Sequence, residues 1–359
     1  MKKINSIQTL RACAFLLILA FHCDFPVIRG SWGVSIFFVL SGFCLCINYL
    51  PRVESLPSSF TGCVRYAFSR VKKLYALHLL MLLFKILFLW GMPHTAKDFV
   101  TLFLNIFLLQ SLIPDYSVYA SYNGVSWFLS TYFIISIAAP ALLRYTSDIK
   151  SKKKLATSAI ITASLMILGA LLSPFITKTL HFKSEMYFTY ICPLYRLLDF
   201  SLGVFVGKYY LIKEKENYIL TTKNSIIVAV LMVFFSVSAT LLYPKLPIYL
   251  RDSLIFAPAS VLAVYLCAFG SSDIQKVLTW KPLVWLGDIS GFAFLIHNNM
   301  LEVVRFCLNI FEQKYGYTRN APEIIFWILA TLILTLIVTQ LYLLAEKKVK
   351  SLLKARVSA

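Results

Sequence analysis

The chain has 359 residues, of which 59% are hydrophobic and only 14% are charged. A soluble domain carries nearer a quarter charged residues, so this composition excludes an ordinary globular protein and indicates a helical protein of the lipid bilayer. The formal net charge is +19, but no basic stripe interleaved with exposed aromatic residues lies outside the apolar segments, which argues against nucleic acid as a partner.

Apolar segments long enough to cross a bilayer recur along the whole chain. They predict an all-α integral membrane fold of ten transmembrane helices, forming one domain over residues 1–359 without an appended periplasmic domain. The apolar run 99–113 is too short for a full crossing and predicts a short re-entrant or interfacial helix. The ten predicted spans are 7–27, 32–50, 74–92, 126–144, 155–176, 189–210, 224–243, 251–270, 284–310 and 323–344.

The placement of basic residues predicts the orientation. With ten crossings and a cytoplasmic N-terminus, the inside segments hold 23 of the 35 Lys and Arg residues and the outside segments hold 8. If residues 99–113 crossed the membrane, the basic loop 150–154 and the C-terminal tail would face outside. We therefore expect a multi-pass protein with both termini in the cytoplasm.

The first span carries two ionisable residues on one face. Arg11 and His22 are eleven residues apart, which is almost three helical turns, so their side chains share a face about 16 Å apart along the axis. Ionisable groups inside a membrane are costly and are usually kept for function. Asp24 points about 200° away from His22 around such a helix, so we give little weight to a role for it in orienting or stabilising that histidine.

The third span begins with a basic cluster at the cytoplasmic interface. Arg70 and Lys73 are spaced i, i+3 and share a helical face, and Lys72 lies between them. Such a group suits phosphates that arrive from the cytosol. By contrast, the eight cysteines form no C-x-x-C pair and no Cys/His cluster at zinc spacing, so we expect buried apolar cysteines and no metal.

Other polar residues lie within the predicted spans and have two interpretations each. Arg196 and Asp199 form either a mutually neutralising pair or a functional pair that contacts a substrate or orients the site. His297 either lines a cavity or is a satisfied structural histidine. Ser41, Trp127 and Ser130 are candidates for lining the same cavity, although tryptophan at this depth is commonly plain packing. Lys85 and Arg305 are expected to snorkel toward the membrane surface.

Six segments in order along the chain resemble the acyltransferase-3 family of membrane O-acyltransferases. The resemblance covers nearly the whole chain. The segments are the R-x10-H pattern of Arg11 and His22, "GVSIFFVLSGF" at 33–43, "RVKKLY" at 70–75, "NGVSWFLS" at 123–130, "YRLLDFSLGVFVG" at 195–207 and "WLGDISGFAFLIH" at 285–297.

The resemblance implies roles for the matching residues. Arg11 and His22 would belong to the catalytic face, and Arg70, with the basic residues that follow it, would contact acyl-CoA. The usual second arginine of this pattern is Lys73 here, which keeps the charge but loses the bidentate fork. Many members place a glutamate soon after the tryptophan of the fourth span, whereas Trp127 is followed here by uncharged residues.

The resemblance also implies a function in the bacterial inner membrane. The chain would move an acyl group, by default acetyl from cytoplasmic acetyl-CoA, to a hydroxyl of an extracytoplasmic or lipid-linked envelope sugar, as in O-antigen or exopolysaccharide. His22 is expected to act as the general base or to carry the acyl group covalently, and the sequence leaves both routes open. A polytopic transporter or a polysaccharide flippase or polymerase is the alternative, although no inverted repeat is visible.

Overall fold

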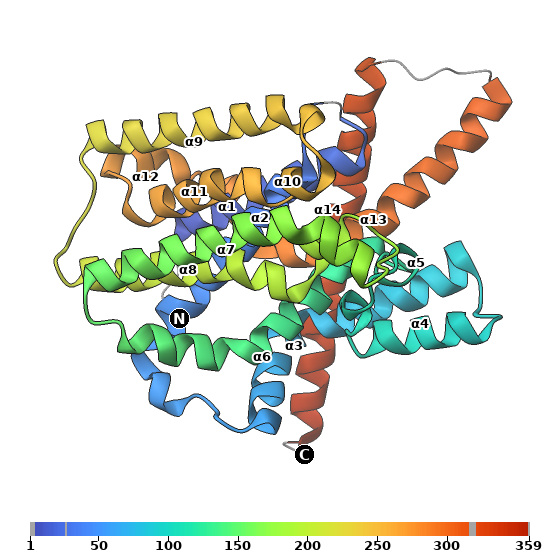
Figure 1. Ribbon diagram of the computed structural model, residues 1–359. Helices are drawn as coiled ribbons and strands as arrows, with labels where there is room; N and C mark the ends of the chain where they lie inside the picture. Colours follow the sequence, from blue (N-terminus) through green and yellow to red (C-terminus); the bar gives the residue numbers. More distant parts are fainter. Residues whose placement is uncertain (1–3, 26, 316–320, 358–359) are drawn as a thin grey trace.

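The computed structural model describes residues 4–25, 27–315 and 321–357, and all regular structure in these ranges is helical. The long helices form an elongated bundle, and many of them run side by side (Figure 1). The α-helices are α1 (Asn5–His22), α2 (Gly30–Tyr49), α3 (Phe60–Lys85), α4 (Ala96–Ile106), α5 (Tyr116–Tyr119), α6 (Trp127–Asp148), α7 (Lys152–Thr179), α8 (Pro193–Glu214), α9 (Thr222–Leu242), α10 (Ile248–Arg251), α11 (Ala257–Phe269), α12 (Ser272–Leu278), α13 (Lys281–Tyr315) and α14 (Ala321–Val357). Short 3₁₀ or π segments are η1 (Leu50–Ser55), η2 (Ile86–Trp90), η3 (Gln110–Leu112), η4 (Gly124–Ser126), η5 (Tyr187–Ile191), η6 (Tyr243–Lys245) and η7 (Leu254–Phe256).

Seven helical segments in the described part of the chain are both long and apolar enough to cross a membrane. They are Gly30–Ser55, Gly124–Asp148, Lys152–Thr179, Tyr187–Glu214, Thr222–Lys245, Ile248–Phe269 and Ile324–Leu353. The other three predicted spans coincide with α1, α3 and α13, which also carry the polar residues of the candidate site. The fold is thus an all-helical membrane protein, and the count of ten crossings stays a prediction.

The apolar run 99–113 forms a short helix, as the sequence predicts. α4 has 11 residues, which corresponds to about 16 Å and is roughly half the thickness of the hydrocarbon core. A capping box between Thr95 and Asp98 begins it, and Leu108 follows its end with a φ of 56° in the left-handed region. This helix is too short to cross the bilayer.

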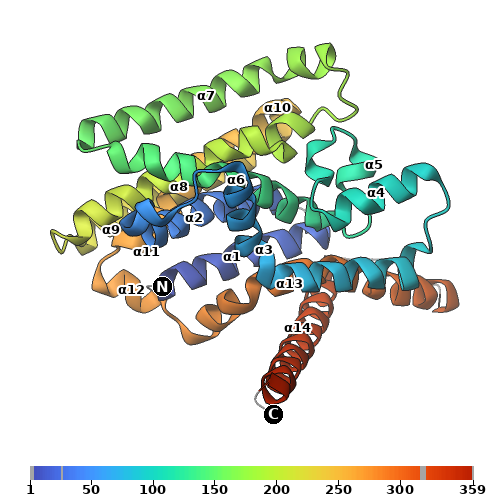
Figure 2. The same ribbon diagram turned by 90° about the horizontal axis from the view of Figure 1, so that it is seen from below.

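Close packing of α2 against α8 forms the centre of the molecule. A Cβ at Gly42 would lie 1.9 Å from the carbonyl oxygen of Phe200, so only glycine allows the two backbones to approach this closely. Seen from below, α7, α8, α2, α1, α13 and α14 follow one another across the bundle, each in contact with the next (Figure 2). The candidate residues of α1 and α13 therefore lie on neighbouring helices.

Two of the predicted spans are broken rather than continuous. The span predicted at 189–210 is a short π segment, η5, followed by α8, which begins at Pro193. The span predicted at 251–270 is interrupted between α10 and α11, where Pro258 stands in the first turn of α11. Proline has no backbone N–H and is favoured in the first turn of a helix, so Pro193 and Pro258 give both breaks a local cause.

Candidate active site

The C-terminal end of α1 meets the middle of α13 at two histidines. The Nδ1 of His22 lies 2.9 Å from the Nε2 of His297, and the two rings stack with centroids 5.1 Å apart. The helices can approach closely because a Cβ at Gly287 of α13 would lie only 1.8 Å from the carbonyl oxygen of Gln8 of α1. The structure therefore joins two candidate residues that are 275 positions apart in the sequence.

The hydrogen bonds around this histidine pair assign the positions of its protons. The Nδ1 of His297 lies 2.6 Å from the carbonyl oxygen of Phe294, which can only accept, so this nitrogen carries a proton. The Nε2 of a neutral His297 then accepts the proton on Nδ1 of His22. In the neutral pair, the Nε2 of His22 is left without a proton and can accept one from a substrate.

A cavity of about 500 Å³ lies beside His22. Lys85 of α3 and Glu302 of α13 form an ion pair on its wall, where the Nδ2 of Asn298 also lies 3.4 Å from Glu302. The expectation that Lys85 snorkels is wrong: its side chain is 1% exposed because it turns inward to meet the carboxylate. The lining residues are Phe21, His22, Lys85, Tyr116, Ser117, Tyr119, Ala120, Ser121, Tyr122, Gly124, Val125, Trp127, Met186, Tyr190, Ile191, Asn298 and Glu302.

Arg305 closes the end of α1. Its Nη2 donates to the carbonyl oxygen of His22 and to the carboxylate of Asp24, both at 2.8 Å. The Arg305 side chain is exposed and satisfies a helix-terminal carbonyl, so its predicted snorkelling stays a prediction. Asp24 has a φ of 62° and contacts this arginine, so it supports the backbone that presents His22.

Residues of α5 form one wall of the cavity. Asp115 caps this helix: its carboxylate accepts from the backbone N–H and the hydroxyl of Ser117 and from Lys183, at 2.9, 2.7 and 3.0 Å. The Ser117 hydroxyl, together with Lys183, lowers the pKa of Asp115 to about 2. The Asp115 carboxylate is therefore charged throughout the neutral pH range, where it keeps its contacts with Ser117 and Lys183.

Arg11 lies on the inner half of α1 and does not line the cavity at His22. It is half-buried, its Nη2 is 3.7 Å from the Sγ of Cys44, and no carboxylate of the described residues lies within 4 Å. Phe15 and Leu19, which stand between Arg11 and His22, are fully buried, and Phe15 packs edge-on against His297. Because Arg11 forms no ion pair with the described residues, its guanidinium is available to bind an anion near the N-terminal half of α1.

The basic cluster of α3 is divided between two environments. Arg70 is half-buried, donates to the hydroxyl of Tyr49 and lies 4.8 Å from the centre of that ring. Lys72 and Lys73 are exposed. The predicted common face of Arg70 and Lys73 is therefore split, with the arginine fixed by aromatic contacts and the lysines free to reach for a ligand.

The remaining candidates, Trp127, Ser130 and Ser41, lie in different environments. Trp127 lines the cavity, and its ring is 5.0 Å from that of Tyr190. Ser130 does not line it: this serine is fully buried and its hydroxyl bonds to the Leu108 carbonyl and to Ser111, both at 2.7 Å. The expected lining position of Ser130 is thus corrected to a structural one. Ser41 is half-buried on α2, away from this cavity.

Arg196 and Asp199 form a fully buried pair, with 2.7 Å between Nη1 and Oδ2. The Nε of Arg196 donates to the carbonyl of Tyr190, which the break before α8 leaves free, at 2.7 Å. Ser253, at the other helix break, donates to Asp199 at 2.9 Å. Neither charged residue lines the cavity at His22, so the pair ties the two broken helices together next to the site.

Glu302 and Asn298 are the wall residues that the sequence analysis missed. The signal was available, because Glu302 is one of two acids, with Asp288, within the apolar predicted span 284–310 and is opposite in sign to Lys85. Hydropathy alone does not say which two helices place such charges together.

The comparisons with known proteins agree with this architecture. The acyltransferase MdmB of Streptomyces mycarofaciens is 25% identical over 307 residues, covering 81% of this chain and 72% of that protein. The peptidoglycan O-acetyltransferase OatA of Listeria monocytogenes is 23% identical over 330 residues, covering 87% of this chain and 52% of OatA, so the chain spans about half the length of that relative. No solved structure gives a significant match. The model of the acyltransferase domain matches residues 4–343, and the chain therefore belongs to the acyltransferase-3 family of membrane acyltransferases.

Proposed function

We propose that this acyltransferase moves a short acyl group, with acetyl as the default, from cytoplasmic acyl-CoA to a sugar hydroxyl on the outer side of the bacterial inner membrane. The observation that carries the proposal is the His22–His297 contact at the edge of a cavity of about 500 Å³ that polar and apolar residues line together. This places an imidazole with one free nitrogen beside a space that can hold a sugar. In this orientation both termini are cytoplasmic.

The reaction needs a base, a donor for the oxyanion and a clamp for the carrier. The Nε2 of His22 takes the proton of the sugar hydroxyl, whose oxygen attacks the thioester carbon. The tetrahedral intermediate then expels the CoA thiolate, which receives that proton from the imidazolium. Lys85 and Asn298 are the donors on the cavity wall that could stabilise the oxyanion.

The carrier would bind at the cytoplasmic face through Arg11, Arg70, Lys72 and Lys73. The positive charges of arginine and lysine at this face complement the negative charges of the CoA phosphates. The distance of about 16 Å along α1 from Arg11 to His22 is comparable to a pantetheine arm. Because Phe15 and Leu19 are fully buried between these residues, delivery of the thioester requires their side chains to move.

Envelope polysaccharide analysed by mass spectrometry tests this function. Cells with the wild-type chain should show an acyl mass increment that is absent without the gene, which identifies the acyl group and the acceptor together. His22→Gln should abolish the increment, since loss of a general base costs about 10²- to 10⁴-fold in rate. The matched control is His94→Gln, because His94 is an exposed histidine outside the cavity. Retained acylation in an accumulating His22→Gln protein would refute the assignment.

Exchange of labelled CoA into acetyl-CoA without an acceptor separates the two chemical routes. A covalent acyl-histidine forms before the acceptor binds, so it supports exchange, whereas direct transfer does not. The tautomer assigned above leaves the Nε2 of His22 free to act as a base or as a nucleophile, so it is compatible with both routes.

A further inference from the structure

Two hydrogen-bond donors in the cavity beside His22 have no partner in the described part of the chain. They are the indole N–H of Trp127, the first residue of α6, and the hydroxyl of Tyr190 in η5, which we call the ring donors. Only 8% of Trp127 is exposed, yet neither donor atom is sealed from solvent. Buried tryptophan and tyrosine side chains usually satisfy these groups, so an unpartnered pair in one cavity indicates an acceptor atom on a substrate.

Most other polar groups of this cavity already bond within the protein. Lys85 and Asn298 both contact the carboxylate of Glu302. The hydroxyl of Tyr116 has no partner among the described residues, but this tyrosine is 64% exposed. Four further hydroxyls bond within the protein at 2.6–3.2 Å, namely those of Ser117, Tyr119, Ser121 and Tyr122. The ring donors can therefore bind a substrate without giving up a contact.

Both rings are held in place before a substrate arrives. The guanidinium carbon of the fully buried Arg196 lies 4.8 Å from the ring centre of Tyr190, and its Nε donates to the carbonyl of the same residue at 2.7 Å. The ring of Trp127 lies 5.0 Å from that of Tyr190 and 6.2 Å from that of Phe128. Donors that are fixed in advance need no reorganisation when charge develops, which makes them effective in catalysis.

The ring donors also lie where negative charge is favoured. Trp127 begins α6, a helix of 22 residues, and Gly124 and Val125 just before it line the same cavity. The N-terminus of a helix carries a partial positive charge. Among the described residues that line the cavity, Glu302 supplies the only carboxylate, and this carboxylate contacts Lys85. An oxygen that gains negative charge is therefore the best acceptor for the ring donors.

The size of the cavity brings the base and the ring donors to one reaction centre. His22 comes from α1, Trp127 from α6 and Tyr190 from η5, and all three border the cavity of about 500 Å³. A sphere of that volume is about 10 Å across, and an oxyanion donor acts at about 3 Å from the oxygen. A tetrahedral intermediate near the centre of the cavity is therefore within reach of His22 and of both ring donors.

We propose that Trp127 and Tyr190 bind the oxyanion that forms during acyl transfer. As the sugar oxygen bonds to the thioester carbon, the electron pair of the C=O π bond moves to the carbonyl oxygen, which accepts from both ring donors. When this pair returns, the C–S bond breaks and the thiolate leaves, while the ring donors keep their protons throughout. Lys85 and Asn298, which already contact Glu302, contribute less. This inference rests on the proposed function, because acyl transfer creates the oxyanion.

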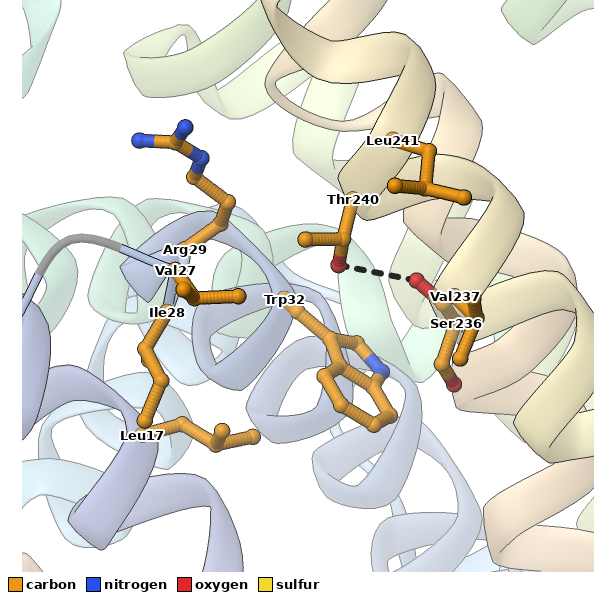
Figure 3. A pocket seen from close by; sticks show the side chains of 9 residues that line it. All are labelled: Leu17, Val27, Ile28, Arg29, Trp32, Ser236, Val237, Thr240 and Leu241. Carbon is orange, nitrogen blue, oxygen red and sulfur yellow. Dashed lines mark hydrogen bonds between the residues drawn. The ribbon is translucent and has the colours of Figure 1, made fainter.

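Trp32 offers a matched comparison in another part of the molecule. Figure 3 shows its indole ring in a groove of about 280 Å³ that residues of α1 and α9, such as Leu17 and Val237, also line. The indole N–H of Trp32 has no partner either, but its nitrogen is sealed from solvent, and His22 does not line this groove. Replacing Trp32 therefore removes an indole N–H outside the proposed oxyanion site.

Steady-state kinetics in proteoliposomes, with acetyl-CoA and envelope glycan as substrates, test the assignment. Tyr190→Phe removes one oxygen and keeps the ring against Arg196. We expect kcat per folded molecule to fall about 10²-fold with little change in KM, since the contact forms only in the transition state. Trp127→Phe should lower kcat by a similar factor, and both variants should bind acetyl-CoA as the wild type does in calorimetry. Trp32→Phe and Tyr145→Phe, an exposed position in the C-terminal part of α6, should keep the wild-type kcat.

Three results would overturn the oxyanion site. The first is a wild-type kcat in Tyr190→Phe. The second is a rise in KM for the glycan without a fall in kcat, because the ring donors would then bind the acceptor before the reaction. The third is an equal loss in Trp127→Phe and Trp32→Phe, because packing of the indole rather than its N–H would then matter. In each case transfer by the wild type would leave the proposed function intact, whereas a wild type that transferred no acyl group would refute both.

Discussion

His22 depends on His297 for its protonation state, and this contact gives the first prediction at the scale of single residues. In His297→Phe the ring position is kept but no nitrogen accepts from Nδ1 of His22, so the tautomer that leaves Nε2 free is no longer selected. We expect kcat to fall about 10²-fold with little change in KM for acyl-CoA. Steady-state kinetics in proteoliposomes measure both constants.

The control for this prediction is His297→Gln, whose amide can restore one acceptor. Its kcat should lie between those of the wild type and His297→Phe, and the pH dependence of kcat should differ between the two variants. If both variants lost only folded protein and kept the wild-type kcat per folded molecule, His297 would be a structural residue.

Asp199 shows how a buried charge stabilises the molecule through its partner. In Asp199→Asn the Ser253 contact can remain, but the fully buried guanidinium of Arg196 loses its counter-charge. We expect a loss of about 3–5 kcal/mol of stability, since a buried charge without its partner is costly. Thermal unfolding in detergent measures it. Asp273→Asn, which breaks an exposed pair with Lys276, should change the unfolding temperature little, and an equal loss in both variants would contradict this account.

At the scale of elements, the distance between α1 and α13 sets the geometry of the histidine pair. Gly287→Ala places a Cβ 1.8 Å from the backbone of Gln8, so the helices must separate. We expect a cost of about 1–3 kcal/mol and a large loss of activity, because His22 and His297 lie on these two helices. Unfolding temperature and acyl transfer are the measurements.

Gly291 on the same helix is the matched control. A Cβ there would meet only the side chain of Leu74, at 3.6 Å, which is ordinary van der Waals contact. Gly291→Ala should therefore keep the stability and the activity of the wild type. If the two alanine variants behaved alike, close approach of α1 and α13 would not be what holds the site.

The elements also show how far the sequence could predict the structure. Long apolar runs placed all the long helices and the short α4, because length and hydropathy are local properties. The breaks before α8 and between α10 and α11 were not predicted from hydropathy, although Pro193 and Pro258 mark them locally; what the sequence could not give is that Arg196 and Ser253 satisfy polar groups there once the helices pack. The histidines were found as candidates, but their contact was not, since nothing local links residues 22 and 297.

Lys85 was misinterpreted for the same reason. A charge in an apolar span has two ways to be satisfied, by reaching the membrane surface or by meeting an opposite charge. The choice depends on which helix lies opposite. Here Glu302, which is distant from Lys85 in the sequence, provides the opposite charge.

At the scale of the whole molecule, the orientation can be tested with single cysteines. Lys153→Cys, in the first turn of α7, is expected inside, whereas Lys97→Cys, in α4, is expected outside; both positions are exposed. In intact spheroplasts a membrane-impermeant maleimide should label only the second, measured against the parent chain. Labelling of both would mean that residues 99–113 invert the rest of the chain.

A bacterial inner membrane stores energy as a proton gradient, and a permanent water-filled channel through this protein would dissipate it. Ala12, Phe15 and Leu19 have no solvent exposure, so the stretch of α1 between its basic and imidazole ends is dry. In the proposed function, an acyl group at the tip of a narrow thioester arm would therefore cross this barrier without a standing water column. The transfer we propose would then cause no proton leak.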